Sequence, residues 1–128
     1  MKRNSVILIP ALNPDKELIQ YIQELKRNGF DDIIVVNDGE KLASYFVEYL
    51  DIFERAKQMD CKVLQHAVNL GKGRALKNGF NEFLNLYQDN PDILGIITVD
   101  SDGQHAVKDV IQIDDWWKKN KCAELLLG

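Results

Sequence analysis

The segment "ILGIITVDSDGQH", residues 93–105, passes directly from an apolar, β-branched stretch into a dense polar one. Residues 93–99 have the composition of a buried strand, and Asp100 and Asp102 follow it one residue apart. Short polar side chains gathered at the end of a buried strand are typical of a binding site. The same order of apolar and polar segments recurs along the chain.

Four other apolar runs resemble residues 93–99, and they lie at residues 5–9, 33–36, 62–66 and 123–127. The segments between the runs have the period of amphipathic helices. Their apolar stripes are Leu18, Ile19, Ile22 and Leu25; Leu42, Phe46, Tyr49, Leu50 and Phe53; Ala75, Leu76, Phe80, Phe83, Leu84 and Tyr87; and Val107, Val110, Ile111 and Trp117. Because the strands are apolar on both faces, this alternation predicts an α/β fold, a mostly parallel sheet with helices on both faces.

The composition is that of a single globular domain. Of the 128 residues 45% are hydrophobic and 28% charged, and no segment approaches the roughly 20 apolar residues of a membrane span. Residues 1–13 predict a first strand and not a signal peptide, because Pro10 and Asn13 interrupt the apolar stretch. The net charge of -4 argues against a nucleic-acid binder. Two distant cysteines, Cys61 and Cys122, favour reduced thiols and a cytoplasmic protein.

Polar segments follow four of the expected strands: "PALNPD", "NDGE", "AVNLGKGRA" and "DSDGQH". In a parallel sheet the carboxyl ends of the strands meet at one edge, and ligands bind there near the point where strand order reverses. We therefore expect these four segments to form one site.

Asp100 and Asp102 have a spacing that suits a metal ion. In an extended segment residues i and i+2 point the same way, so both carboxylates, with Gln104, can face one Mg²⁺ or Mn²⁺. The alternative is that these residues form a turn or cap a helix. An EF-hand calcium loop is excluded, because its twelfth position needs a glutamate and is occupied here by Ile111.

Lys72 and Arg74 lie in the glycine-rich stretch "NLGKGRA", where a helix is expected to begin. The unpaired N–H groups and positive dipole of a helix N-terminus suit a phosphate, although the spacing is not that of a Walker sequence. The alternative is a solvated helix face. Asp38, after the second strand, can accept hydrogen bonds from a nucleotide base or sugar, or it can belong to an "NDG" turn.

Other conspicuous side chains receive no catalytic role. His66 falls in a strand run and is interpreted as a structural histidine with satisfied polar atoms. His105 stands beside the acid pair, but one histidine does not make a ligand set. Trp116 and Trp117 are interpreted as core and surface cover.

The ordered motifs "VILIPALN", "IIVVNDGE", "NLGKGRALKNGF" and "VDSDGQH" resemble the nucleotide-sugar-binding half of family 2 glycosyltransferases of GT-A fold. The polyprenyl-phosphate sugar synthase-like branch is the most similar. The resemblance implies a Rossmann-like domain that binds a UDP- or GDP-linked sugar with Mn²⁺ or Mg²⁺. It further implies inverting transfer to an acceptor such as a polyprenyl phosphate or a glycan.

The resemblance also implies roles for individual residues. The segment of Pro10, Ala11 and Asn13 lies against the nucleotide, and Asp38 recognises the base. Lys72, and less closely Arg74, match the stretch near the donor. The acidic segment supplies the donor and metal residues Asp100, Ser101 and Asp102, and Gln104 joins the metal.

Two features depart from the family pattern. Glu40 stands where relatives commonly have a serine after "DG". The catalytic base of the family lies well downstream of the acid pair, on a segment that also forms the acceptor site, and is expected beyond residue 128. Residues 1–128 are therefore expected to be one donor-binding domain without the acceptor part, which binds donor and metal but transfers sugar poorly or not at all.

Three other interpretations remain open. A phosphatase of the haloacid dehalogenase type also places D-x-D-G after an apolar strand, but its motif usually opens the chain. A nucleotidyltransferase should carry a glycine-rich basic loop after its first strand, and "PALNPDKE" is not one. The third is a non-catalytic nucleotide-binding module or a fragment of a larger protein.

Overall fold

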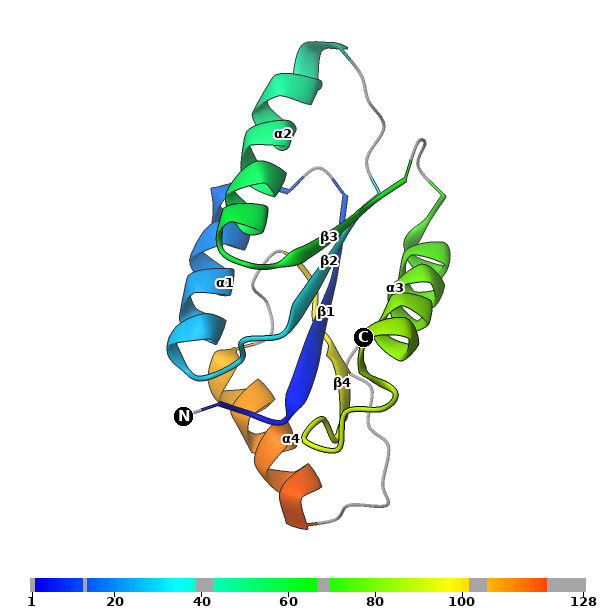
Figure 1. Ribbon diagram of the computed structural model, residues 1–128. Coiled ribbons are helices and arrows are strands. Elements are labelled where there is room, and N and C mark those ends of the chain that lie inside the picture. The colour runs from blue at the N-terminus through cyan, green and yellow to red at the C-terminus, as the bar shows by residue number, and fades with distance from the viewer. Residues whose placement is uncertain (1, 13, 39–42, 67–69, 102–105, 120–128) are drawn as a thin grey trace.

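The computed structural model describes residues 2–12, 14–38, 43–66, 70–101 and 106–119. Strands and helices alternate along the chain, as the sequence predicts (Figure 1). The elements are β1 Ser5–Ala11, α1 Lys16–Arg27, β2 Ile33–Asn37, α2 Ala43–Gln58, β3 Lys62–Gln65, α3 Lys72–Tyr87, β4 Gly95–Thr98 and α4 Val107–Lys119. The expected fifth strand, residues 123–127, lies outside the described residues.

The four strands form one parallel sheet in the order β3-β2-β1-β4. Ile7 of β1 is in register with Ile33 of β2 on one side and with Ile97 of β4 on the other. The chain adds β2 and β3 on one side of β1 and then crosses to place β4 on the other side. Strand order therefore reverses at β1, and its carboxyl end borders the crevice where such sheets bind ligands.

The helices cover both faces of the sheet, as predicted. In Figure 1, α1, α2 and α4 lie on one face and α3 lies on the other. Along β1, Ile7 and Ile9 pack in the larger core with α1, α2 and α4, whereas Val6 and Leu8 pack against α3. Successive side chains of a strand point to opposite faces, so an uninterrupted apolar run serves two cores.

Local sequence determines where α1 begins and ends. The carboxylate of Asp15 accepts a hydrogen bond from the backbone N–H of Glu17 at 2.9 Å, which caps the first turn. Lys26 lies in the last turn, where a cation interacts favourably with the helix dipole, and Gly29 follows with a φ of 92°.

Three exposed side chains depart from the simple apolar pattern. Leu84, expected on the buried stripe of α3, is 52% exposed; among the described helices only α3 lies on this face of the sheet. Lys62 and Gln65 of β3 are exposed, since β3 is an edge strand of the described sheet. In the part of the chain that the structure describes, no helix combines the length and apolar character needed to cross a membrane.

Candidate functional site

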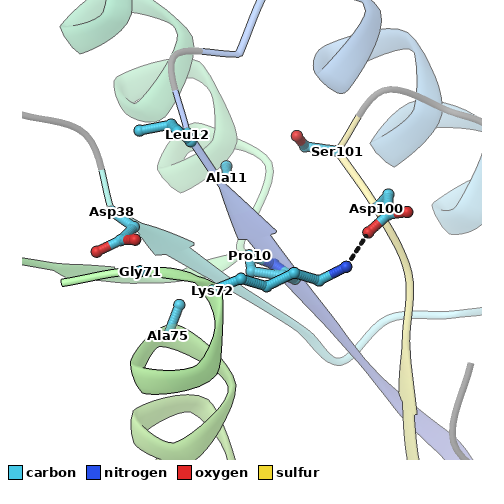
Figure 2. Close-up of a pocket in the computed structure, with 9 residues that line it drawn as sticks. All are labelled: Pro10, Ala11, Leu12, Asp38, Gly71, Lys72, Ala75, Asp100 and Ser101. Atoms are coloured by element: carbon cyan, nitrogen blue, oxygen red, sulfur yellow. Dashed lines mark hydrogen bonds and ion pairs between the residues drawn. The ribbon is translucent and has the colours of Figure 1, made fainter. Parts of the chain in front are cut away.

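A cavity of about 530 Å³ lies at the carboxyl edge of the sheet (Figure 2). This volume is within the range of roughly 300–1,000 Å³ typical of small-molecule sites. Its walls come from the end of β1, from the residues that follow β2 and β4, and from the start of α3. They comprise Pro10, Ala11, Leu12, Asp38, Gly71, Lys72, Ala75, Asp100 and Ser101.

The end of β1 explains why the sheet opens here. Leu8 pairs with Thr98 in the last position of the β1–β4 register, and Leu8 accepts a hydrogen bond from the N–H of Val99. Pro10, two residues later, faces the same side of β1 and has no N–H to donate. On the other side, Ala11 still accepts a hydrogen bond from the N–H of Asp38 at 3.0 Å. The sheet therefore continues toward β2 but parts from β4, and the cavity lies in that gap.

Asp38 is a buried residue, with only 4% of its surface exposed. Its Oδ1 atom lies 2.6 Å from Nδ1 of His66 and accepts a hydrogen bond from the N–H of Leu70 at 2.9 Å. Its Oδ2 atom has no hydrogen-bond partner among the described residues. Because Asp38 lines the cavity, this carboxylate can accept a hydrogen bond from a ligand.

Lys72 and Asp100 form an ion pair across the cavity. The ammonium nitrogen of Lys72 donates to Oδ1 of Asp100 at 2.9 Å, and Figure 2 shows the lysine side chain passing Pro10 to reach it. The side chain of Lys72 is 54% exposed and that of Asp100 is 28% exposed. An exposed pair of this kind exchanges readily with solvent and ligands, so the lysine can also reach an anion in the cavity.

Gly71, the N-cap residue that precedes α3, has a backbone conformation that only glycine adopts easily, with φ 91° and ψ 160°. No side chain caps the helix at this position. The first N–H groups of a helix have no partner within the helix, and together with the helix dipole they favour an anion. The start of α3 thus presents a dipole end and the Lys72 cation to the same cavity.

The structure brings together the predicted site residues Pro10, Ala11, Asp38, Lys72, Asp100 and Ser101. Arg74 is exposed on α3 and is not among the residues that line the cavity; its role near the donor stays a prediction. The predicted residues Asn13, Asp102 and Gln104 lie outside the described residues. Within the described ranges, no three His, Cys, Asp or Glu side chains gather as a metal site.

Sequence reasoning did not identify Leu70 and Asn78 as members of the site. Leu70 donates its N–H to Asp38, and Asn78 contacts His66 with its Nδ2 atom 2.8 Å from Nε2. His66 is 7% exposed with both ring nitrogens in contact with polar atoms, as expected of a structural histidine, but one of those atoms belongs to the cavity residue Asp38. A backbone N–H and a contact between helix and strand leave no signal in the sequence.

The sequence of the chain also matches a known protein family. Residues 6–123 match the family described as "Glycosyl transferase family 2". The chain belongs to glycosyl transferase family 2. The parallel sheet and the cavity at its carboxyl edge are consistent with the nucleotide-binding domain of such an enzyme.

Three curated relatives match this family 2 chain. "Uncharacterized protein MJ1222" of Methanocaldococcus jannaschii is 36% identical over 107 residues, which cover 84% of the chain and 39% of the relative. "UDP-N-acetylglucosamine--dolichyl-phosphate N-acetylglucosaminyltransferase" of Methanococcus voltae is 29% identical over 116 residues, covering 84% and 44%. "Uncharacterized protein MJ0544" of M. jannaschii is 26% identical over 107 residues, covering 82% and 43%. The chain thus spans about two fifths of the length of these relatives. No solved structure matches it.

Proposed function

We propose that this family 2 chain binds the nucleotide-diphosphate sugar of an inverting glycosyltransferase in the cavity at the carboxyl edge of its sheet. The observation that carries the proposal is the convergence of Asp38, Lys72 and Asp100 on one cavity. These residues follow β2, begin α3 and follow β4, so they are far apart in the sequence. A nucleotide-diphosphate sugar needs an acceptor for its base and positive charge for its diphosphate, and the cavity offers both.

In this proposal Asp38 receives the base. A buried carboxylate accepts hydrogen bonds and donates none, so it selects for N–H groups on the ligand. Uracil and guanine both carry ring N–H donors, which accords with UDP- or GDP-linked donors. The apolar walls at Pro10, Ala11 and Leu12 suit the flat surface of a base or a ribose.

Lys72 and the start of α3 bind the diphosphate. Cleavage of the bond between sugar and phosphate develops negative charge on the departing diphosphate, and a fixed cation nearby stabilises that charge in the transition state. Lys72 is held by Asp100 at 2.9 Å in the described structure. Binding of the donor therefore redirects the lysine from this carboxylate to a phosphate.

A divalent cation is part of the proposal and fits the one described carboxylate at the proposed position. Asp100 offers an oxygen ligand of the kind that Mg²⁺ and Mn²⁺ prefer, and Asp102 and Gln104, which are outside the described residues, complete the proposed set. When bound, such an ion supplies Lewis-acid stabilisation of the leaving diphosphate.

The acceptor in this proposal is a polyprenyl phosphate. The support is the Methanococcus voltae relative, which is named as an N-acetylglucosaminyltransferase acting on dolichyl phosphate and of which the matched region covers 44%. The activity of the whole protein, the catalytic base and inversion at the anomeric carbon are parts of the proposal. So is a location in the cytoplasm.

The test is titration calorimetry of UDP and GDP with the chain, in Mn²⁺ and in a chelator. We expect at least one nucleotide to bind about tenfold or more tightly with Mn²⁺, and Asp102→Ala to remove that gain. A matched control is Asp109→Ala, an exposed acid on α4 outside the cavity, which should leave the gain intact. Equal binding in Mn²⁺ and chelator, for every nucleotide tried, would contradict the metal-dependent site.

The same preparation separates the other candidate functions. A phosphatase of the haloacid dehalogenase type hydrolyses a generic aryl phosphate with Mg²⁺, and we expect no such hydrolysis. A non-catalytic nucleotide-binding module binds UDP or GDP but does not discriminate among their sugar conjugates. A thermal-stability screen of nucleotide sugars distinguishes these cases, because a ligand that binds only the folded chain raises its stability.

A further inference from the structure

Three polar side chains next to the cavity contact one another in sequence. Asp38 follows β2, His66 follows β3, and Asn78 lies in the second turn of α3. Oδ1 of Asp38 lies 2.6 Å from Nδ1 of His66, and Nε2 of His66 lies 2.8 Å from Nδ2 of Asn78. Only Asp38 of the three lines the cavity. We call this row the Asp38–His66–Asn78 relay.

The hydrogen bonds of the relay point in one direction. A carboxylate only accepts, so the Nδ1 atom of His66 is the donor toward Asp38. The other ring nitrogen of a neutral imidazole then accepts, which matches the amide N–H₂ group that Asn78 presents to Nε2. Asp38 and Asn78 therefore favour the same tautomer of His66, with the proton on Nδ1, and Asn78 holds the ring on the side opposite Asp38.

The relay also determines which oxygen of Asp38 is left for a ligand. Both hydrogen-bond donors to this carboxylate, His66 Nδ1 and Leu70 N, contact Oδ1. Two donors on one oxygen restrict rotation of the carboxylate, and Oδ2 remains as the acceptor without a partner among the described residues. Side chains held in this way lose less entropy when a ligand binds.

The backbone around His66 does not depend on its ring. The N–H of His66 donates to the carbonyl of Asn37 at 2.9 Å, which continues the pairing of β2 and β3. Asn37 and Gln65 add a side-chain hydrogen bond of 2.9 Å beside it. Substitution of the imidazole should therefore leave the sheet intact and act on Asp38.

We propose that His66, oriented by Asn78, is a positioning residue that holds the Asp38 carboxylate for the base of a nucleoside diphosphate. This inference rests on the proposed function of the cavity. His66 does not touch the ligand; it acts through Asp38. Through Asn78 and Lys72, α3 thereby contributes both to the position of Asp38 and to binding of the diphosphate.

The test compares two substitutions that separate volume from hydrogen bonding. His66→Phe keeps a ring of similar size and has no donor, whereas His66→Asn places an N–H donor near the position of Nδ1 and loses volume. Calorimetry in Mn²⁺ uses two probes, the nucleoside diphosphate that the wild type prefers and inorganic pyrophosphate, which has no base. We expect His66→Phe to weaken nucleoside diphosphate binding about tenfold and His66→Asn to stay within about threefold of wild type. Pyrophosphate binding should stay within about twofold in both variants.

Two controls accompany this comparison. Asn78→Ala removes the amide group that contacts Nε2 of His66 and orients the ring, and it should weaken nucleoside diphosphate binding about threefold without changing pyrophosphate binding. Ser5→Ala removes a buried hydrogen bond at the opposite edge of the sheet and should leave both affinities unchanged. Circular dichroism checks that each variant is folded.

The outcomes distinguish this inference from the proposed function. Wild-type affinity in His66→Phe would overturn the positioning role and leave the proposed function standing. Equal losses in His66→Phe and His66→Asn, with pyrophosphate binding weakened in parallel, would show a structural role only and overturn the inference. Failure of the wild-type chain to bind any nucleoside diphosphate would overturn the proposed function and the inference with it.

Discussion

Two buried aspartates at opposite edges of the same sheet differ in their hydrogen bonds. Asp114, on α4 at the amino edge, is fully buried. Its Oδ1 accepts from the Ser5 hydroxyl at 2.7 Å and from the N–H of Asn4 at 3.2 Å, and its Oδ2 is 3.3 Å from Nη1 of Arg3. Asp38, at the carboxyl edge, uses only Oδ1 within the described residues.

The hydrogen bonds of Asp114 and Asp38 indicate different roles for the two edges of the sheet. A carboxylate with both oxygens satisfied inside the protein joins elements, here the start of β1 and α4. A carboxylate at a cavity wall that uses one oxygen within the protein can accept a hydrogen bond from a ligand with the other. The amino edge is closed, with Trp117 and Phe30 buried in the core, whereas the carboxyl edge opens where β1 parts from β4.

The largest effect on stability is expected from Asp114→Ala. Removing the Asp114 carboxylate leaves the buried Ser5 hydroxyl and the N–H of Asn4 without this acceptor and breaks the ion pair with Arg3. Loss of one partner of a buried ion pair typically lowers the free energy of unfolding by about 3–5 kcal/mol. Urea denaturation measures the loss. The matched control is Asp115→Ala, whose exposed carboxylate also pairs with Arg3 and should matter by less than about 1 kcal/mol. Equal losses of unfolding free energy in Asp114→Ala and Asp115→Ala would contradict the structural role assigned to the buried carboxylate at the amino edge.

The next effect is expected from Gly71→Ala at the carboxyl edge. Nothing lies near the added methyl group, so the cost comes from the backbone conformation and should be about 1–3 kcal/mol of unfolding free energy. Gly73→Ala is the control, because Gly73 also has open space, lies inside α3 and has an ordinary φ. We expect Gly73→Ala to stabilise the chain by up to about 1 kcal/mol. The same sign in both variants, measured by urea denaturation, would contradict this account.

A smaller effect is expected from alkaline pH at the amino edge, where Cys61 precedes β3. Burial raises the pKa of the Cys61 thiol from 9.0 to about 11, with lesser and opposed contributions from Lys26 and Asp60. The unfolded chain then loses this proton before the folded chain does, so stability falls as pH rises above about 9. The loss should be about 1 kcal/mol by about pH 10.

Unfolding of wild type and Cys61→Ala across this pH range measures the contribution of the thiol. The wild type should lose more stability with rising pH than the variant. The tyrosines titrate later, since burial, chiefly, raises the pKa of both Tyr21 and Tyr87 to about 12. Parallel pH curves for wild type and variant would refute the assignment to Cys61.

The smallest effect on stability is expected from Lys72→Met, which breaks an exposed ion pair at the carboxyl edge. The free energy of unfolding should change by less than about 1 kcal/mol. Pyrophosphate binding, measured by calorimetry, should nevertheless weaken about tenfold, because the cation at the cavity is lost. Lys77→Met, on an exposed position of α3 outside the cavity, should change neither quantity. Unchanged pyrophosphate binding in Lys72→Met would contradict the proposal that the diphosphate binds beside Lys72.

Much of the fold could be predicted from the sequence. The period of the apolar residues located all four described helices, and the two-sided apolar strands indicated a parallel sheet with helices on both faces. The exposure of Leu84 was not predictable, because it depends on how many helices share a face. The seven-residue extent of β1 was also missed, since Pro10 looks like a strand terminator when its neighbours are unknown.

The candidate site was predictable in part. The rule that parallel strands end at one edge placed Asp38 and Asp100 together, and the glycine-rich start of α3 added Lys72. The sequence did not show that Asp38 is buried, since this depends on the segments packed around it; the alternative of an "NDG" turn includes Gly39, which lies outside the described residues. Arg74 could not be distinguished from Lys72 by spacing, since both lie in the first turn of the helix and only its rotation decides which one faces the cavity.

The sequence by itself determined the periodicity, the order of elements and the chemical character of each strand end, because these depend on neighbours along the chain. Only the tertiary structure decided that Lys72 reaches Asp100, that β1 parts from β4 beside Pro10, and that Asn78 contacts His66 behind Asp38. Those contacts join segments from different elements. Their geometry depends on how the helices pack against the sheet, which no local pattern of residues contains.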